Sequence, residues 1–145
     1  SSGTGIGTTG TDYGAYNRLS NNKTPQFACP QENDLYTTSS SDKGNKALDY
    51  PIGLITADEV AYAGGVNSVP NSSYYLYTGD VYWTMSPRNF RGSIANEWVV
   101  FANGYLTGFF VGGSVGSRPA INLKSGIEIT GGDGTIGNEY IIKVS

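Results

Sequence analysis

Short runs of apolar residues, separated by glycine, asparagine and proline, dominate the chain from residue 81 onward. Their length and their content of Val, Ile, Tyr and Trp are typical of β-strands. We predict strands over residues 81–85, 97–102, 105–111, 118–123 and 140–144. Pro87 is expected to end the first run. Asn103-Gly104, between the second and third, predicts a hairpin with a type I′ turn, because both residues tolerate positive φ.

The alternation of side chains along a strand divides the aromatic residues of these runs between two faces. If Trp98 and Val100 face one side of the sheet, then Val99 and Phe101 face the other. We therefore expect Tyr82 or Trp83, and one of Trp98 and Phe101, to lie in the core.

Residues 56–65 carry the clearest helix pattern. Thr56 stands at the N-cap, Glu59 completes a capping box, and Ile55 and Val60 occupy hydrophobic-staple positions. Gly64 can adopt the left-handed backbone conformation that commonly ends a helix. The two carboxylates of the first turn suit the positive end of the helix dipole, so we assign them no catalytic role.

Residues 1–49 are rich in Gly, Ser, Thr, Asn and Asp, which predicts an irregular, loop-rich layer. Tyr13, Tyr16 and Leu19 have the spacing of a short amphipathic helix over residues 12–19. The glycines of residues 5–10 match a dinucleotide-binding pattern, but no hydrophobic strand precedes them, so we interpret them as a flexible entry. We expect a single domain, 1–145, in which this layer precedes a core of residues 50–145.

The chain has no histidine and a single cysteine, Cys29. This composition excludes Ser-His-Asp and Cys-His nucleophilic systems, histidine metal ligands and cysteine-rich zinc sites. We therefore expect no enzymatic activity, no cofactor and no metal. Cys29 cannot form an intrachain disulfide, which leaves a buried side chain, an exposed thiol and an intermolecular bond as alternatives.

Charge and hydropathy exclude some classes of binding partner. The nine basic residues are scattered and the net charge is −3, so we expect no binding to nucleic acid. No apolar run approaches the ~20 residues that span a bilayer, so we expect no membrane insertion by this segment. A charged content of 14%, beside 21 glycines, indicates an exported protein, secreted or at the cell surface.

Five ordered motifs between residue 50 and the C-terminus carry a family resemblance. They are Tyr50-Pro51-Ile52-Gly53-Leu54-Ile55-Thr56-Ala57-Asp58-Glu59, Ala63-Gly64-Gly65, Tyr82-Trp83-Thr84-Met85-Ser86-Pro87, Arg118-Pro119-Ala120-Ile121-Asn122-Leu123-Lys124 and Thr130-Gly131-Gly132-Asp133-Gly134-Thr135. The series resembles exported Gram-positive bacterial proteins, some of them pilin-like, whose C-terminal domains are similar to the formylglycine-generating-enzyme branch of the C-type lectin fold. The resemblance implies an α+β fold, loop-rich, with short antiparallel strands and one or two short helices. It also implies a protein encoded by a bacterium or a phage.

Departures from that family limit the activity. Its oxidases need a reactive cysteine pair, whereas this chain has only Cys29, outside the resembling region. Its calcium-binding lectins use Glu-Pro-Asn or Gln-Pro-Asp and Trp-Asn-Asp tripeptides, and none occurs here. Asp133 lies among glycines that supply too few oxygens for calcium, so we predict that residues 130–135 form a tight turn.

Residues 74–110 hold eleven of the eighteen aromatic residues, interleaved with Gly, Ser and Asn. Residues 88–91 follow a proline break, and we expect them to form an exposed loop. A mixture of Tyr, Ser, Gly and Asn with Arg is typical of recognition loops. We therefore predict a ligand-binding surface made of Tyr74, Tyr75, Tyr77, Arg88, Asn89, Phe90, Arg91, Asn96, Asn103, Tyr105 and Phe109.

Two functional hypotheses follow. The first is a non-enzymatic extracellular binding or adhesion module that presents this Tyr-, Asn- and Arg-rich face to a protein or a glycan. Such a face also suits a variable display protein of a diversity-generating retroelement, whose mutagenesis of adenines leaves Asn, Tyr and Ser on one surface of a lectin-like fold. The alternative is a pilin-like structural subunit that self-assembles into an extracellular filament, which the low charge and the unpaired Cys29 suit.

Overall fold

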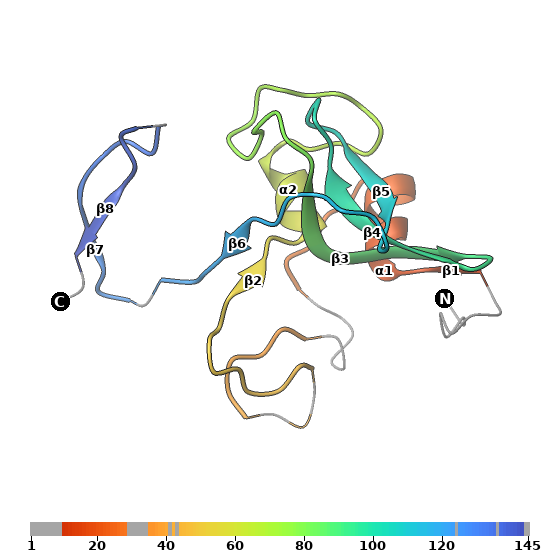
Figure 1. Ribbon diagram of the computed structural model, residues 1–145, viewed down its shortest axis with the longest axis horizontal. Coiled ribbons are helices and arrows are strands. Elements are labelled where there is room, and N and C mark those ends of the chain that lie inside the picture. Colours follow the sequence, from red (N-terminus) through yellow and green to blue (C-terminus); the bar gives the residue numbers. More distant parts are fainter. Residues whose placement is uncertain are drawn as a thin grey trace.

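The computed structural model describes residues 10–28, 35–40, 42, 44–123, 125–135 and 137–143, so Cys29 and residues 5–9 lie outside it. Over these residues the chain is a small α+β protein with few helices and antiparallel sheets (Figure 1). Its elements are β1 (Thr11–Asp12), α1 (Gly14–Tyr16), a π-helix (Asn17–Asn22), β2 (Gly53–Leu54), α2 (Ala57–Ala63), β3 (Tyr82–Arg91), β4 (Ile94–Val100), β5 (Leu106–Phe110), β6 (Pro119–Ala120), β7 (Glu128–Gly131) and β8 (Ile141–Lys143).

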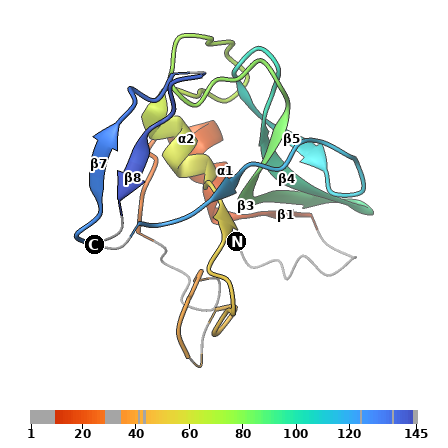
Figure 2. The same ribbon diagram turned by 60° about the vertical axis from the view of Figure 1, so that its left-hand side comes forward.

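A four-stranded antiparallel sheet in the order β1-β3-β4-β5 forms the centre of the molecule. One face carries Tyr82, Trp98 and Val100, which pack with residues of α2 and the N-terminal helices into the main hydrophobic cluster. Figure 2 shows these helices lying along the sheet. The prediction that one residue of each pair lies in the core, Tyr82 or Trp83 and Trp98 or Phe101, is therefore confirmed by Tyr82 and Trp98. Val99 points to the opposite face and is also fully buried, so both faces of β4 are covered.

Helix α2 forms as its local sequence predicts. The Thr56 side chain accepts a hydrogen bond from the Glu59 backbone N–H, and the Glu59 carboxylate accepts one from the Thr56 N–H. Val60 is fully buried, and Ile55 packs against the same cluster. Gly64 ends the helix with a φ of 124°, a backbone conformation that favours glycine.

The prediction that the first strand ends at Pro87 is wrong. β3 continues through Pro87 to Arg91, with irregularities in its pairing to β4 on both sides of the proline. Proline has no backbone N–H to donate to a neighbouring strand. The irregular pairing around Pro87 lets the strand continue without that hydrogen bond. Residues 88–91 are consequently not a loop. Their register is set by pairing with β4 and with β1, where Thr11 lies opposite Phe90.

The hairpin between β4 and β5 lies where Asn103-Gly104 predicts it, but its turn type differs. Only Gly104 has positive φ (82°), whereas Asn103 does not. The Gly104 N–H donates to the Phe101 carbonyl, and the Phe101 N–H donates to the Tyr105 carbonyl. This is the three-residue hairpin loop in which a turn is followed by a left-handed glycine, rather than the two-residue type I′ turn.

The N-terminal layer contains more regular structure than its composition suggests. The predicted helix over 12–19 appears as the end of β1, a single turn of α-helix and a π-helix, with Leu19 buried. An ion pair joins this layer to α2: Arg18 donates from Nε and Nη2 to the carboxylate of Asp58, at 2.8 and 2.7 Å. The Gln26 backbone N–H donates to the same carboxylate at 2.9 Å.

The C-terminal strands are shorter than predicted. Of residues 118–123 only Pro119–Ala120 pair as a strand, with β2, and of the described residues 140–143 only Ile141–Lys143 do, with β7. Between β7 and β8, the Asp133 carboxylate accepts hydrogen bonds from the Thr135 N–H and hydroxyl, as the predicted turn requires. The β7–β8 hairpin stands apart from the body in Figure 1 and is called the arm below.

Candidate functional site

Three residues of the predicted binding surface lie inside the protein. Tyr74 is buried, and its hydroxyl donates to the Gly104 carbonyl at 2.8 Å. Burial raises the pKa of Tyr74 to about 12, with a smaller contribution from Tyr82. Asn89 and Phe90 are 5% and 8% exposed. The prediction that they contact a ligand is wrong, because β3 continues through both residues between β1 and β4 and their side chains are buried.

Arg88 also belongs to the interior architecture. Its guanidinium carbon lies 4.9 Å from the ring centroid of Tyr16 and 4.8 Å from that of Trp98, so the cation is held between two aromatic rings. Desolvation lowers the pKa of Arg88. A Cβ on Gly108 would lie 2.6 Å from Arg88 Cδ, so this glycine leaves the space that the arginine side chain crosses.

The remaining predicted residues are distributed over separate surfaces. Arg91 is exposed and forms an ion pair with Asp12, and Asn96 is half-buried and donates to Asn89 at 3.0 Å. Tyr75 is 82% exposed. Of the others, Asn103 is exposed at the tip of its hairpin, whereas Tyr77, Tyr105 and Phe109 are partly buried. The structure does not bring the eleven predicted residues together into one face.

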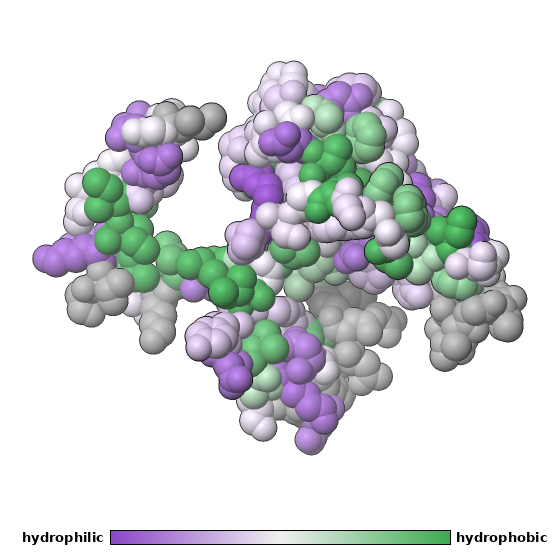
Figure 3. Space-filling model, in the orientation of Figure 1, coloured by the Kyte–Doolittle hydropathy of each residue, from purple (hydrophilic) through white to green (hydrophobic). Residues whose placement is uncertain are grey.

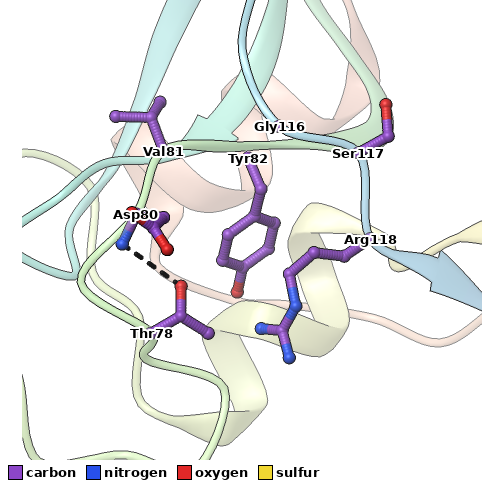
Figure 4. A pocket seen from close by; sticks show the side chains of 7 residues that line it. All are labelled: Thr78, Asp80, Val81, Tyr82, Gly116, Ser117 and Arg118. Atoms are coloured by element: carbon purple, nitrogen blue, oxygen red, sulfur yellow. Dashed lines mark hydrogen bonds between the residues drawn. The ribbon is translucent and has the colours of Figure 1, made fainter.

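The structure instead shows a pocket of about 430 Å³ between residues 78–82 and residues 116–118. The pocket is shallow and open, because most of its lining residues are themselves exposed to solvent. Residues before and at the start of β3 form one wall, and the segment that leads into β6 forms the other (Figure 4). The lining residues are Thr78, Asp80, Val81, Tyr82, Gly116, Ser117 and Arg118.

Backbone hydrogen bonds hold the two walls together. The Gly116 N–H donates to the Val81 carbonyl at 3.0 Å, and the Trp83 N–H donates to the Gly116 carbonyl at 2.9 Å. A Cβ on Gly116 would lie 3.0 Å from the Val81 oxygen, so glycine permits this close approach. On the other wall, the Asp80 N–H donates to the Thr78 hydroxyl at 3.3 Å and orders the turn.

Arg118 is anchored at the rim of the pocket. Its Nη1 donates to the Leu76 carbonyl at 3.1 Å, and its guanidinium carbon lies 4.9 Å from the centroid of the Tyr82 ring. The Tyr82 hydroxyl donates to the same carbonyl at 2.8 Å. Burial raises the pKa of Tyr82, and the positive charge of Arg118 opposes that rise.

Asp80 and Arg118 carry opposite charges into one pocket without pairing with each other. Figure 4 shows them on opposite sides of the Tyr82 ring. Both residues are exposed, and no ion pair forms between them. A guanidinium has five N–H donors, so Arg118 retains donors beyond its bond to the Leu76 carbonyl. The pocket thus holds a carboxylate acceptor and cationic donors side by side.

Comparisons with protein-family models, curated proteins and solved structures found no match for this chain. Two further findings concern the described residues only. None of their helices is long and apolar enough to cross a membrane. They contain no group of three or more His, Cys, Asp or Glu residues that can hold a metal ion.

Few features of the sequence indicate this pocket. Arg118 is recognisable only as part of the closing Arg-Pro motif, and Asp80 only as a turn residue beside Gly79. Their proximity depends on the parallel bridge between Tyr82 and Gly116, which are 34 positions apart in the chain. A pairing between segments so distant has no local sequence signal.

Proposed function

We propose that this chain is a non-enzymatic, extracellular binding module whose ligand, carried by a glycan or a protein, enters the Arg118 pocket. The observation that carries the proposal is that one pocket holds two opposite charges that form no ion pair with each other. Asp80 can accept hydrogen bonds from hydroxyl or ammonium groups of a ligand, and Arg118 can donate to carboxylate or hydroxyl oxygens. An acidic sugar, or a protein loop with an acidic side chain beside hydroxyl groups, carries both kinds of group.

The architecture around the pocket supports a binding role. The Leu76 carbonyl accepts a hydrogen bond from Arg118 and another from the Tyr82 hydroxyl, so the arginine side chain is held in place before a ligand binds. Preorganised donors lose less entropy on binding. We further propose that the body is a variant of the C-type lectin-like fold of the formylglycine-generating-enzyme type. The motif series over residues 50–135 and the antiparallel, loop-rich α+β architecture support this assignment.

Glycan and peptide arrays, followed by calorimetry on the best ligand, test the function. A charge-assisted hydrogen bond contributes about 1.5–3 kcal/mol, so Arg118→Ala should weaken binding about 10- to 100-fold. Asp80→Asn should weaken it less, because an amide still accepts one hydrogen bond.

Arg91→Ala is the matched control, since it removes another exposed arginine at a distance from the pocket along β3. Binding that survives Arg118→Ala but is lost in Arg91→Ala would move the site to the β3–β4 tip and overturn the proposal. Thermal unfolding of each variant separates a binding defect from a folding defect.

A further inference from the structure

The face of the central sheet that lies away from the hydrophobic cluster carries two aromatic rings and one carboxylate. Trp83 and Val99 are direct partners in the β3–β4 register. Glu97 and Phe109 are direct partners in the β4–β5 register, and Glu97 is two positions from Val99. These side chains therefore project from the same face of the sheet. Hydrophobic surface is visible in Figure 3 where Figure 1 shows β4 and β5.

The two rings are held in place by the sheet and by the segment that follows β5. Their centroids lie 5.9 Å apart, and Val99 between them is fully buried. A Cβ on Gly113 would lie 2.3 Å from Phe109 Cε1, so this glycine lets the chain lie against the edge of the ring. Trp83 and Phe109 are only partly buried. They consequently present preformed aromatic surface to a partner.

Glu97 is a half-buried acid beside these rings. Its carboxylate forms no hydrogen bond or ion pair with any other residue that the structure describes. Burial raises the pKa of Glu97, as expected for a carboxylate that meets apolar rings and no cation.

The charges of the neighbouring strands do not compensate Glu97. It is the only charged residue of β4, and neither β5 nor residues 111–117 contain one. Of the two cations of β3, Arg88 lies on the opposite face between two aromatic rings, and Arg91 pairs with Asp12. A cation that reaches this face from outside therefore meets a carboxylate that is already partly desolvated and has no competing partner among these strands.

The chemistry of the site suits an alkylammonium group. An ammonium pairs with a carboxylate through charge-assisted hydrogen bonds and is attracted to the faces of aromatic rings. A lysine side chain also carries an apolar stem, which packs on apolar surface while the charged end stays in reach of its partner. Small-molecule sites enclose most of their ligand, whereas a sheet face contacts its ligand from one side, as a side chain that projects from another protein requires.

We propose that Glu97, Trp83 and Phe109 form a binding site for a lysine side chain of a partner protein. The ammonium pairs with the Glu97 carboxylate, and the stem of the lysine lies across the two rings. The proposal does not depend on the Arg118 pocket, because none of these three residues lines it.

Nuclear magnetic resonance of the full chain tests the proposal with capped glycine peptides whose central residue is lysine, norleucine or arginine. The lysine peptide should bind with a roughly millimolar dissociation constant. The norleucine peptide should bind about 10- to 100-fold more weakly, because it has the stem but no charge. The lysine peptide should also lower the pKa of the Glu97 carboxyl group, read from its carbon chemical shift, since a bound cation favours the ionised form. This measurement needs no variant.

Three substitutions locate the site. Glu97→Gln should weaken the lysine peptide to the level of the norleucine peptide. Phe109→Leu keeps an apolar side chain but removes a ring, so it should weaken the lysine peptide about 2- to 30-fold. Glu128→Gln is the matched control, because Glu128 is another strand glutamate, exposed on β7, and should leave binding unchanged. Arg118→Ala should also leave it unchanged.

Several outcomes would overturn the proposal. They are equal binding of the lysine and norleucine peptides, no binding of the lysine peptide well above millimolar concentration, and lysine binding that survives Glu97→Gln. Tighter binding of the arginine peptide would likewise overturn the assignment to an ammonium group. A pKa of Glu97 that does not respond to the lysine peptide would show that the cation binds elsewhere.

Discussion

Replacing Asp58 by alanine is expected to destabilise the folded chain strongly. Asp58 is 3% exposed, and its carboxylate accepts two hydrogen bonds from Arg18 and one from the Gln26 backbone N–H. The substitution removes the carboxylate partner of a side chain that is itself only 19% exposed. It also leaves the Gln26 N–H without this acceptor.

The magnitude follows from the burial of the pair. Removing one partner of a buried ion pair costs about 3–5 kcal/mol, and the partial exposure of Arg18 favours the lower end, about 3 kcal/mol. Stability changes of 1 kcal/mol shift the Tm of a domain of this size by about 3–4 °C. We therefore expect Asp58→Ala to lower the Tm by about 10 °C.

Calorimetry on a double-mutant cycle tests this reasoning. Arg18→Ala, Asp58→Ala and the double variant should show a coupling energy of about 2 kcal/mol, because the two side chains share one interaction. Asp80→Asn, an exposed carboxylate, is the control and should change the Tm little. A Tm for Asp58→Ala within 2 °C of this control, or a coupling below about 0.5 kcal/mol, would refute a stabilising clamp.

Three further predictions concern the sheet. Burial raises the pKa of Glu97, so its carboxyl group binds a proton more tightly in the folded chain than in the unfolded chain. The free energy of unfolding therefore falls as the pH rises from the ordinary carboxyl pKa of about 4.3 through the raised pKa of Glu97. Glu97→Gln should thus raise the Tm at pH 7 but not below pH 4, and a pH-independent effect would contradict this. Tyr74→Phe removes the hydroxyl bond to the Gly104 carbonyl and should cost about 1–1.5 kcal/mol in urea denaturation; an unchanged midpoint would count against it. Gly108→Ala should displace the Arg88 guanidinium from its aromatic rings and alter the near-ultraviolet circular dichroism, whereas an unaltered spectrum would show that the side chain adapts in place.

Features that depend only on residues close in the sequence were predictable. The capping box of α2 needs only Thr56 and Glu59, three positions apart, and the structure contains it. The position of the β4–β5 hairpin was likewise evident from Asn103-Gly104. Its turn type was not, because the choice between two- and three-residue loops depends on the register of the flanking strands.

Features that depend on distant segments were missed. Pro87 is normally a strand breaker, and only the irregular pairing of β3 with β4 shows that the strand passes through it. Asn89 and Phe90 lie in a strand flanked by β4 and by β1, and the two residues of β1 carry no recognisable strand pattern. The same limit applies to the arm: the sequence predicts strands near residues 140–144 but does not tell whether their isoleucines are covered.

The pairing of β1 with β3 has a kinetic consequence. Strands β3, β4 and β5 follow one another through short connections and can pair early. In contrast, Asp12 of β1 and Arg91 of β3, whose side chains form an ion pair, are 79 residues apart. Closing so long a loop is slow relative to forming adjacent hairpins. Strand β1 is thus expected to add late in folding, so that weakening the Asp12–Arg91 pair accelerates unfolding while leaving the folding rate nearly unchanged.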